Sequence, residues 1–131
     1  MITTRFDEGT GILWVVVEGP AVASEIIEVL DELYLRDGAR VFRRRLWDLR
    51  KSTTQLTPDE MRQVSDVVNR LTRPGFGRTV ILTETDVQYG VARTMLPRVE
   101  GQPVEFQVVR TEQEAIAWLD SGDEKEMSAG G

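Results

Sequence analysis

The chain has 131 residues and a net charge of −6, which indicates one acidic domain. It contains no cysteine and no histidine, so disulfides, thiol nucleophiles, histidine-based catalytic triads and the commonest metal ligands are excluded. The acidic balance argues against nucleic acid as a partner, and the longest apolar run, residues 12–17, is too short to span a bilayer. No signal peptide is recognisable. We therefore expect a cytoplasmic protein without a metal or a cofactor.

The chain begins with two predicted strands. Ile2, Thr4 and Phe6 alternate with more polar neighbours, which is typical of a half-buried strand. Residues 12–17 are apolar and rich in β-branched side chains, as in a strand buried on both faces. Turn residues separate the two, so we expect an antiparallel hairpin. An amphipathic helix follows, with apolar residues at helical spacing: Val22, Ile26, Ile27, Leu30, Leu33 and Tyr34.

A short third strand at residues 45–49 and a polar loop lead to the second helix. Thr57 is its predicted N-cap, with Pro58 in the first turn and Glu60 completing a capping box. Arg73-Pro74-Gly75 ends this helix.

The rest of the chain repeats the alternation of strand and helix. Residues 79–82 predict a buried strand, and Asp86 caps a helix that ends or kinks near Pro97. Residues 104–108 alternate as a strand near the sheet edge, and a second capping box at residues 111–114 opens the last helix.

The predicted order is ββαβαβαβα, which is typical of an α/β fold. We expect a mixed, mostly parallel sheet of about five strands with helices packed on it, because alternating strands and helices join by right-handed crossovers. Residues 1–120 form a single domain in this interpretation, and the small and charged residues 121–131 form a flexible C-terminal tail.

Four stretches of the chain resemble the STAS domain family. They are GILWVVVEGP at residues 11–20, LWDLR at 46–50, YGVARTM at 89–95 and EQEAIAWL at 112–119. The third is similar to a Gly-x-Ala-Arg-x-Met element of the small bacterial proteins labelled STAS/SEC14-like, most of which have no known function. The resemblance covers residues 1 to about 120 and implies a SpoIIAA/STAS-like fold.

The resemblance also implies binding in place of catalysis. STAS domains bind protein partners such as kinases and other regulators, and some are switched by phosphorylation at the loop or helix start after the third strand. The matching segment here is Leu56-Thr57-Pro58-Asp59, which keeps a hydroxyl but lacks the serine and glycine of the signalling members. Thr57 is thus a candidate phosphoacceptor, although its N-cap role is the favoured interpretation. The SEC14 likeness implies a lipid or small apolar ligand.

A candidate binding edge lies at the carboxyl ends of the predicted parallel strands, where ligands of such sheets bind. Tyr89 and Arg93 are one helical turn apart and should share a face. A carboxylate, an arginine and a helix N-terminus suit an anionic group, whereas the structural alternative is a loop cap, an ion pair and packing. The candidate residues of the edge are Asp48, Arg50, Thr83, Glu84, Tyr89 and Arg93.

Basic residues cluster before and within the third strand. They are a candidate patch for an acidic partner, a phosphate or an anionic lipid, but a solvated loop is the more frequent explanation of a short basic stretch. The patch comprises Arg40, Arg43, Arg44 and Arg45.

Three functions follow from these observations. The first is a non-enzymatic, regulatory protein-binding module. The second is a SEC14-like carrier or sensor of a small apolar or lipid-like ligand, with the chain's tryptophans as candidate wall residues. The third is an enzyme using Asp48, Tyr89 and Arg93, which is disfavoured because no matched pair of titrating groups is recognisable. The first or last strand is an edge at which a second copy could pair, and the sequence leaves the oligomeric state open.

Overall fold

The computed structural model describes the backbone of residues 1–35, 42–99 and 101–130, and the side chains of these ranges as far as residue 122. Its elements follow the predicted order ββαβαβαβα, which confirms the α/β class. They are β1 (Ile2–Asp7), β2 (Ile12–Gly19), α1 (Ala23–Leu35), β3 (Arg44–Ser52), α3 (Pro58–Leu71), β4 (Arg78–Leu82), α4 (Asp86–Val99), β5 (Glu105–Val109) and α5 (Glu112–Gly130).

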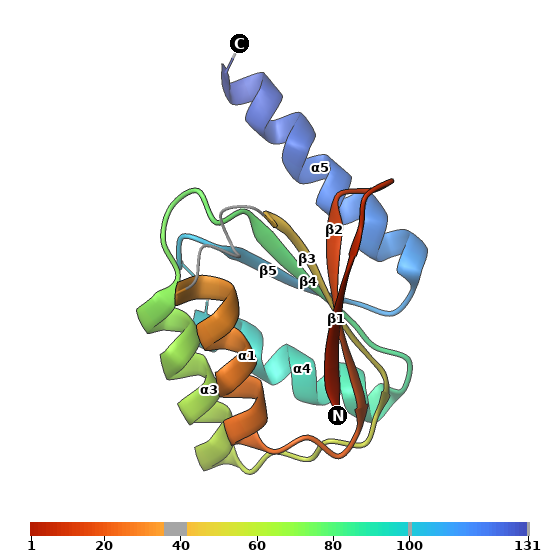
Figure 1. Ribbon diagram of the computed structural model, residues 1–131, viewed down its shortest axis with the longest axis vertical. Coiled ribbons are helices and arrows are strands. Elements are labelled where there is room, and N and C mark those ends of the chain that lie inside the picture. The colour runs from red at the N-terminus through yellow and green to blue at the C-terminus, as the bar shows by residue number, and fades with distance from the viewer. Residues whose placement is uncertain (36–41, 100, 131) are drawn as a thin grey trace.

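The five strands form one sheet in the order β1-β2-β3-β4-β5. β1 pairs with β2 in antiparallel fashion, and the other three pairings are parallel, so the predicted mixed sheet is confirmed. Helices α1, α3 and α4 cover one face of the sheet, and α5 alone covers the other (Figure 1). The molecule therefore has three layers, with the carboxyl ends of the parallel strands meeting at one edge.

Alternation along the strands divides the core into two clusters, because successive side chains point to opposite faces of a sheet. Leu13, Val15 and Val17 belong to the cluster beneath α1, α3 and α4. Ile12 and Trp14 belong to the cluster beneath α5. The continuous apolar run of β2 thus supplies both cores.

The Thr57 cap has the predicted form. Its side chain accepts a hydrogen bond from the Glu60 amide at 3.1 Å, and the Glu60 carboxylate accepts one from the Thr57 amide at 3.1 Å. The cap at Thr111 is half of the predicted box. Its hydroxyl oxygen accepts from the Glu114 amide, but the hydroxyl itself, in place of the backbone amide, donates to the Glu114 carboxylate.

One helix boundary differs from the prediction. Thr85, not Asp86, caps α4, since its hydroxyl oxygen accepts from the Gln88 amide at 3.1 Å. Asp86 instead lies in the first turn and pairs with Arg110 at 2.9 Å. The carboxyl end of α4 agrees with the prediction, since the helix ends at Val99, two residues after Pro97.

Strand β3 is longer than predicted and carries a β-bulge near its carboxyl end. The pairing with β2 shifts by one residue between Val16 and Glu18, so that Glu18 lies opposite Lys51. A bulge reverses the alternation of side chains beyond it, and the strand extends past Leu49 to Ser52. The sequence prediction stops at Leu49 because the residues after it are polar.

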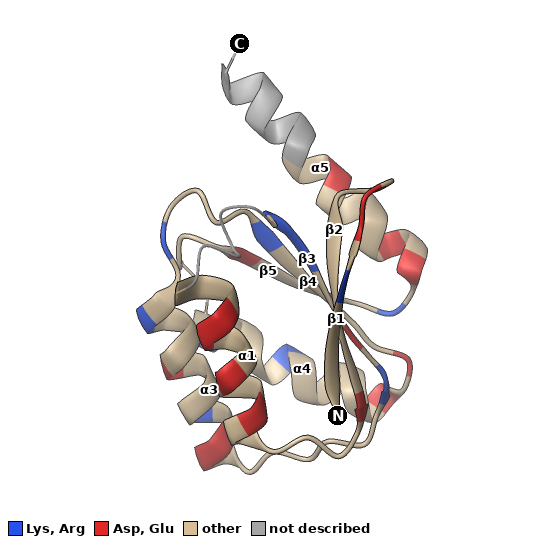
Figure 2. Ribbon diagram, viewed as in Figure 1, with Lys and Arg blue, Asp and Glu red and all other residues tan. Residues whose placement is uncertain are grey.

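Helix α5 continues through the predicted domain boundary as far as Gly130, and the division into a domain and a flexible tail at residue 120 stays a prediction. Acidic residues line the outer side of α1 (Figure 2), as its amphipathic pattern predicts. In the part of the chain that the structure describes, no helix combines the length and the apolar character that a bilayer span requires.

Candidate functional site

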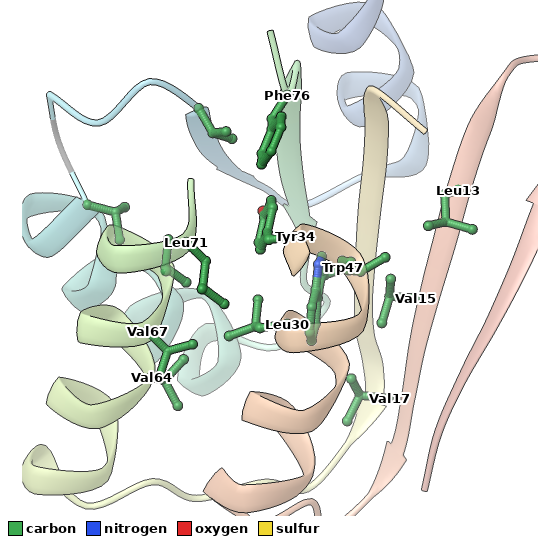
Figure 3. Close-up of a cluster of buried hydrophobic side chains, with 14 of the residues drawn as sticks. Leu13, Val15, Val17, Leu30, Tyr34, Trp47, Val64, Val67, Leu71 and Phe76 are labelled. Atoms are coloured by element: carbon green, nitrogen blue, oxygen red, sulfur yellow. The ribbon is translucent and has the colours of Figure 1, made fainter. Parts of the chain in front are cut away.

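A cavity of about 540 Å³ lies between the sheet and helices α1, α3 and α4. Val17 and Trp47 form part of its floor on the strands, and Leu30 and Val64 face them from α1 and α3 (Figure 3). Ala92 and Met95 of α4 contribute to the same lining. The walls are predominantly apolar, and the volume falls in the range of roughly 300–1,000 Å³ that is usual for small-molecule sites.

The cavity opens at the carboxyl ends of β3 and β4. Its exposed lining residues all lie there, in the segment from Lys51 to Gln55 and at the start of α4, where Val87 and Val91 are 71% and 40% exposed. We call this region the mouth. The opposite, inner end is formed by buried residues near the amino ends of the strands, among them Tyr34 and Thr79.

The cavity is too large to be both empty and closed. An empty closed cavity costs about 24 cal/mol per Å³, so one of about 540 Å³ would cost about 13 kcal/mol. That equals the whole stability of an ordinary domain, about 5–15 kcal/mol. A volume of this kind is sustainable when it is open to solvent or filled by a ligand, and the exposed residues at the mouth provide the opening.

The inner end contains a small polar group within the apolar core. The Arg45 side chain is fully buried. It donates hydrogen bonds to the Thr79 hydroxyl oxygen at 3.1 Å and to the Phe42 carbonyl at 2.8 Å. Its guanidinium lies 5.2 Å from the centre of the Tyr34 ring, which stacks on Phe76. Burial lowers the pKa of Arg45, and the neighbouring Tyr34 partly offsets this effect.

Hydrogen bonds hold the mouth in shape. The Gln88 side chain donates to the Ser52 carbonyl at 3.0 Å and accepts from the amides of Glu84 and Thr85. It therefore links the start of α4 to the end of β3. On the other side, the Thr54 hydroxyl oxygen accepts from the Ala21 amide at 2.8 Å, which ties the loop after β3 to the segment before α1.

At the same edge, Asp48 and Arg50 form a two-pronged ion pair. The Arg50 guanidinium donates to both carboxylate oxygens, at 3.0 and 2.9 Å, and the Arg50 amide donates at 3.0 Å. Burial alone would raise the pKa of Asp48, but these hydrogen bonds and the nearby Lys51 together lower it below its ordinary value. Arg50 also lies 3.9 Å from Glu112.

A second cluster of charged and aromatic side chains lies on the outside of α4. The Arg93 guanidinium donates to the Tyr89 hydroxyl at 3.0 Å. The Tyr89 ring has Arg93 at 5.5 Å and Arg110 at 5.3 Å from its centre, so two cations contact one ring. Arg110 is in turn paired with Asp86.

Two solved structures are similar to this chain over most of its length. One is an uncharacterised DUF3478-family protein with a SpoIIAA-like fold from Shewanella loihica PV-4, with a TM-score of 0.53 and 15% identity over 91% of this chain and 92% of that chain. The fold is SpoIIAA-like. The other is the anti-sigma factor antagonist SpoIIAA in its unphosphorylated form, with a TM-score of 0.49 and 12% identity over 92% of this chain and 98% of that chain. Neither a family model nor a curated protein matches.

The SpoIIAA-like fold brings only part of the predicted binding edge together. Asp48 pairs with Arg50, and Tyr89 with Arg93, so each cation already has a partner. Thr83 is fully buried and donates to the Val109 carbonyl at 2.8 Å, which places its hydroxyl between strands and away from the surface. The Glu84 carbonyl accepts from Arg110. The roles in binding of these six residues, and of Thr57 in phosphorylation, stay predictions.

The predicted basic patch is not a continuous surface of the SpoIIAA-like fold. Arg45 is buried beneath α1, whereas Arg44 is on the opposite side of β3 and pairs with Asp120 of α5. Arg43 is exposed, and Arg40 is outside the described residues. Adjacent strand residues face opposite ways, so three consecutive arginines do not share a face. The expectation of one patch is wrong for Arg45.

The sequence interpretation missed the cavity. Of the three tryptophans, only Trp47 is among its wall residues, whereas Trp14 and Trp118 belong to the α5 side. Tyr34 and Thr79 were expected only as buried parts of a helix and a strand. The unusual feature beside them is the buried Arg45. The sequence alone does not show which of three consecutive arginines is buried. In the ranges that the structure describes, no cluster of three or more metal-ligating side chains of the types His, Cys, Asp and Glu is present.

Proposed function

We propose that this protein binds a small apolar molecule, which it holds between the sheet and helices α1, α3 and α4. The cavity of about 540 Å³ carries the proposal. Each methylene group that moves from water into such a site contributes about 0.8 kcal/mol. A ligand of modest size would thus gain enough free energy to offset the cost of its own immobilisation.

The chemistry of the wall favours binding over catalysis. The cationic side chains in the lining are Arg50 and Lys51, both at the mouth, and Arg50 is engaged by Asp48. Neutral hydroxyl and amide groups make up the remaining polar lining. Proton transfer near neutral pH usually needs a histidine or a carboxylate with a matched partner, and the chain has no histidine. A carrier or sensor is the function that this wall supports best.

Native mass spectrometry of the protein, gently purified from its own cells, tests the proposal. We expect an additional mass of a few hundred daltons that is lost on denaturation. Ala92→Phe, which places a ring in the cavity, should abolish the additional mass. Ala117→Phe is the matched control, because Ala117 is exposed on α5, and it should retain it.

Two outcomes would contradict ligand binding. A bare chain from native cells that also takes up no Nile red in vitro would overturn the proposal. Equal retention by Ala92→Phe and wild type would show that the bound molecule lies elsewhere. Ala92→Leu, a smaller change at the same position, keeps the test informative if the phenylalanine variant does not fold.

A second candidate function is a regulatory module that binds a protein partner. The exposed apolar side chains of Val87 and Val91 on α4 favour it, since exposed apolar clusters mark interaction sites. Replacing both valines with lysine should then abolish co-purification of a specific protein. If the lysine variant retains the partner unchanged, this surface of α4 is not where the partner docks.

A further inference from the structure

Two hydroxyl groups at the inner end of the cavity have no acceptor for their protons among the described residues. The Tyr34 hydroxyl is buried and donates no hydrogen bond to any described residue, although Tyr34 is part of the cavity wall. Thr79 is 1% exposed and also lines the cavity. Its hydroxyl oxygen accepts from the Arg45 side chain, and no hydrogen bond donated by Thr79 is present among the described residues. A buried polar group without a partner costs about 1–3 kcal/mol.

The neighbouring arginine decides which kind of ligand atom would satisfy these hydroxyls. A guanidinium has five donors and no acceptor, so Arg45 takes up neither hydroxyl proton. The two protons are left for a group that accepts hydrogen bonds. An oxygen with several lone pairs accepts both protons, whereas an ammonium has no lone pair and accepts neither.

We infer that the ligand is an apolar-chain carboxylic acid whose carboxylate binds Tyr34 and Thr79 at the inner end of the cavity. This inference rests on the proposed function. A carboxylate accepts hydrogen bonds at both oxygens, so it satisfies both hydroxyls at once. The buried Arg45 side chain donates to the Thr79 hydroxyl oxygen, and its guanidinium lies 5.2 Å from the centre of the Tyr34 ring. Hydrogen bonds to charged acceptors are about twice as strong as neutral ones. The acid enters first, and its chain fills the apolar space toward the mouth.

The distance from the inner end to the mouth leaves room for a long aliphatic chain of the ligand. Thr79 and Thr85 both line the cavity and are six residues apart, along and just beyond β4. At the extended-strand rise of about 3.3 Å per residue, that separation is at most about 20 Å, because residues 83–85 lie beyond the strand. The cavity between these two residues is lined on its helical side by Val64, Val68 and Ala92. A straight aliphatic chain of about twelve carbons suits this shape.

The test compares dodecanoate with 1-dodecanol by titration calorimetry, below their aggregation concentrations. Wild type should bind dodecanoate at least tenfold more tightly than 1-dodecanol. Tyr34→Phe should lose about tenfold in affinity for dodecanoate and leave the alcohol within twofold. The other tyrosine of the chain supplies the matched control, since Tyr89 lies on the outside of α4 with Arg93, and Tyr89→Phe should bind both molecules like wild type.

The unliganded variant provides a readout that is independent of binding. Removing a buried hydroxyl whose proton has no acceptor should leave the Tm of Tyr34→Phe close to that of wild type, which also shows that the variant folds. Equal affinity for acid and alcohol in wild type, or an unchanged dodecanoate affinity in Tyr34→Phe, would overturn the carboxylate site and leave the apolar cavity intact. If Lys51→Met and not Tyr34→Phe weakens dodecanoate, the acid lies at the mouth and the inference is wrong. Failure of both molecules to bind contradicts the proposed function itself.

Discussion

The two faces of the sheet are packed differently. Beneath α5, Leu46, Val80 and Leu82 are fully buried against Ala115 and Leu119 of a single helix. Beneath α1, α3 and α4, the alternate residues of the same strands border a cavity of about 540 Å³. One helix with small and branched residues packs against the sheet beneath it. On the other face, α3 contacts both α1 and α4, and the three helices leave space between themselves and the strands. The filled core beneath α5 therefore stabilises the fold, and the opposite face contains the space in which a ligand can bind.

This comparison predicts the largest effect for loss of volume on the α5 face. Leu46→Ala should lower the free energy of unfolding by about 3–5 kcal/mol, because it creates a new cavity in a filled core. Leu30→Ala, on the cavity wall, should cost about 1–3 kcal/mol less than Leu46→Ala, since it only enlarges an existing space. Urea denaturation of both variants measures the difference. Equal losses would mean that the two faces are packed alike.

Larger side chains should also be tolerated differently on the two faces of the sheet. Ala115→Leu should destabilise the protein by about 1–3 kcal/mol, because Ala115 is fully buried against the sheet and overpacking forces its neighbours to move. Ala92→Leu should be neutral or stabilising, since its side chain extends into the cavity. Thermal unfolding of the ligand-free variants decides between the two, and a loss at Ala92 as large as that at Ala115 would contradict the account.

The polar end of β3 contributes a smaller, pH-dependent effect. The pKa of Asp48 is lowered in the folded protein, so its contribution is fully present above the unfolded pKa, near 3.8, and is lost as the pH falls through the lower folded value. Asp48→Asn should cost about 1 kcal/mol at neutral pH and flatten the decline in stability below pH 4. An unchanged acid profile in this variant would show that Asp48 and Arg50 do not stabilise the fold.

The smallest effect on stability is expected at the mouth. Val87→Ser should change the free energy of unfolding by less than about 0.5 kcal/mol, because the side chain is 71% exposed. The same variant should accelerate ligand exchange if α4 borders the entrance. Stopped-flow release of Nile red measures that rate, with Val22→Ser as the control, since Val22 is exposed but outside the cavity.

Much of the architecture was predictable because it depends on local patterns. The period of two in β1 and of three to four in α1 and α3 gave the element types, and the Thr57 capping box fixed the start of α3. The resemblance to STAS domains implied the SpoIIAA-like fold, which the structural comparison confirms. The Thr85 cap was missed because two adjacent residues, Thr85 and Asp86, are both good caps and only the side-chain hydrogen bond distinguishes them.

The candidate site was not predictable in the same way. A cavity depends on how far the helices stand from the sheet, which is the sum of many side-chain volumes and has no short motif. Thr83 is polar yet fully buried, because the Val109 carbonyl satisfies it. Arg45 is buried because Thr79 and Phe42 accept its hydrogen bonds. These partners are either far away in the sequence or backbone carbonyls, which every residue has. The sequence therefore shows no sign of them, and Thr83 and Arg45 were expected at the surface.

The most direct test of the account is a methyl NMR titration of the protein with 1-dodecanol. The methyl signals of Leu30 and Val64, which line the cavity, should shift progressively and saturate. Those of Leu46 and Leu119, which pack beneath α5, should stay in place. Equal shifts on both faces, or none on either, would contradict the claim that one face of this sheet is a filled core and the other a binding site.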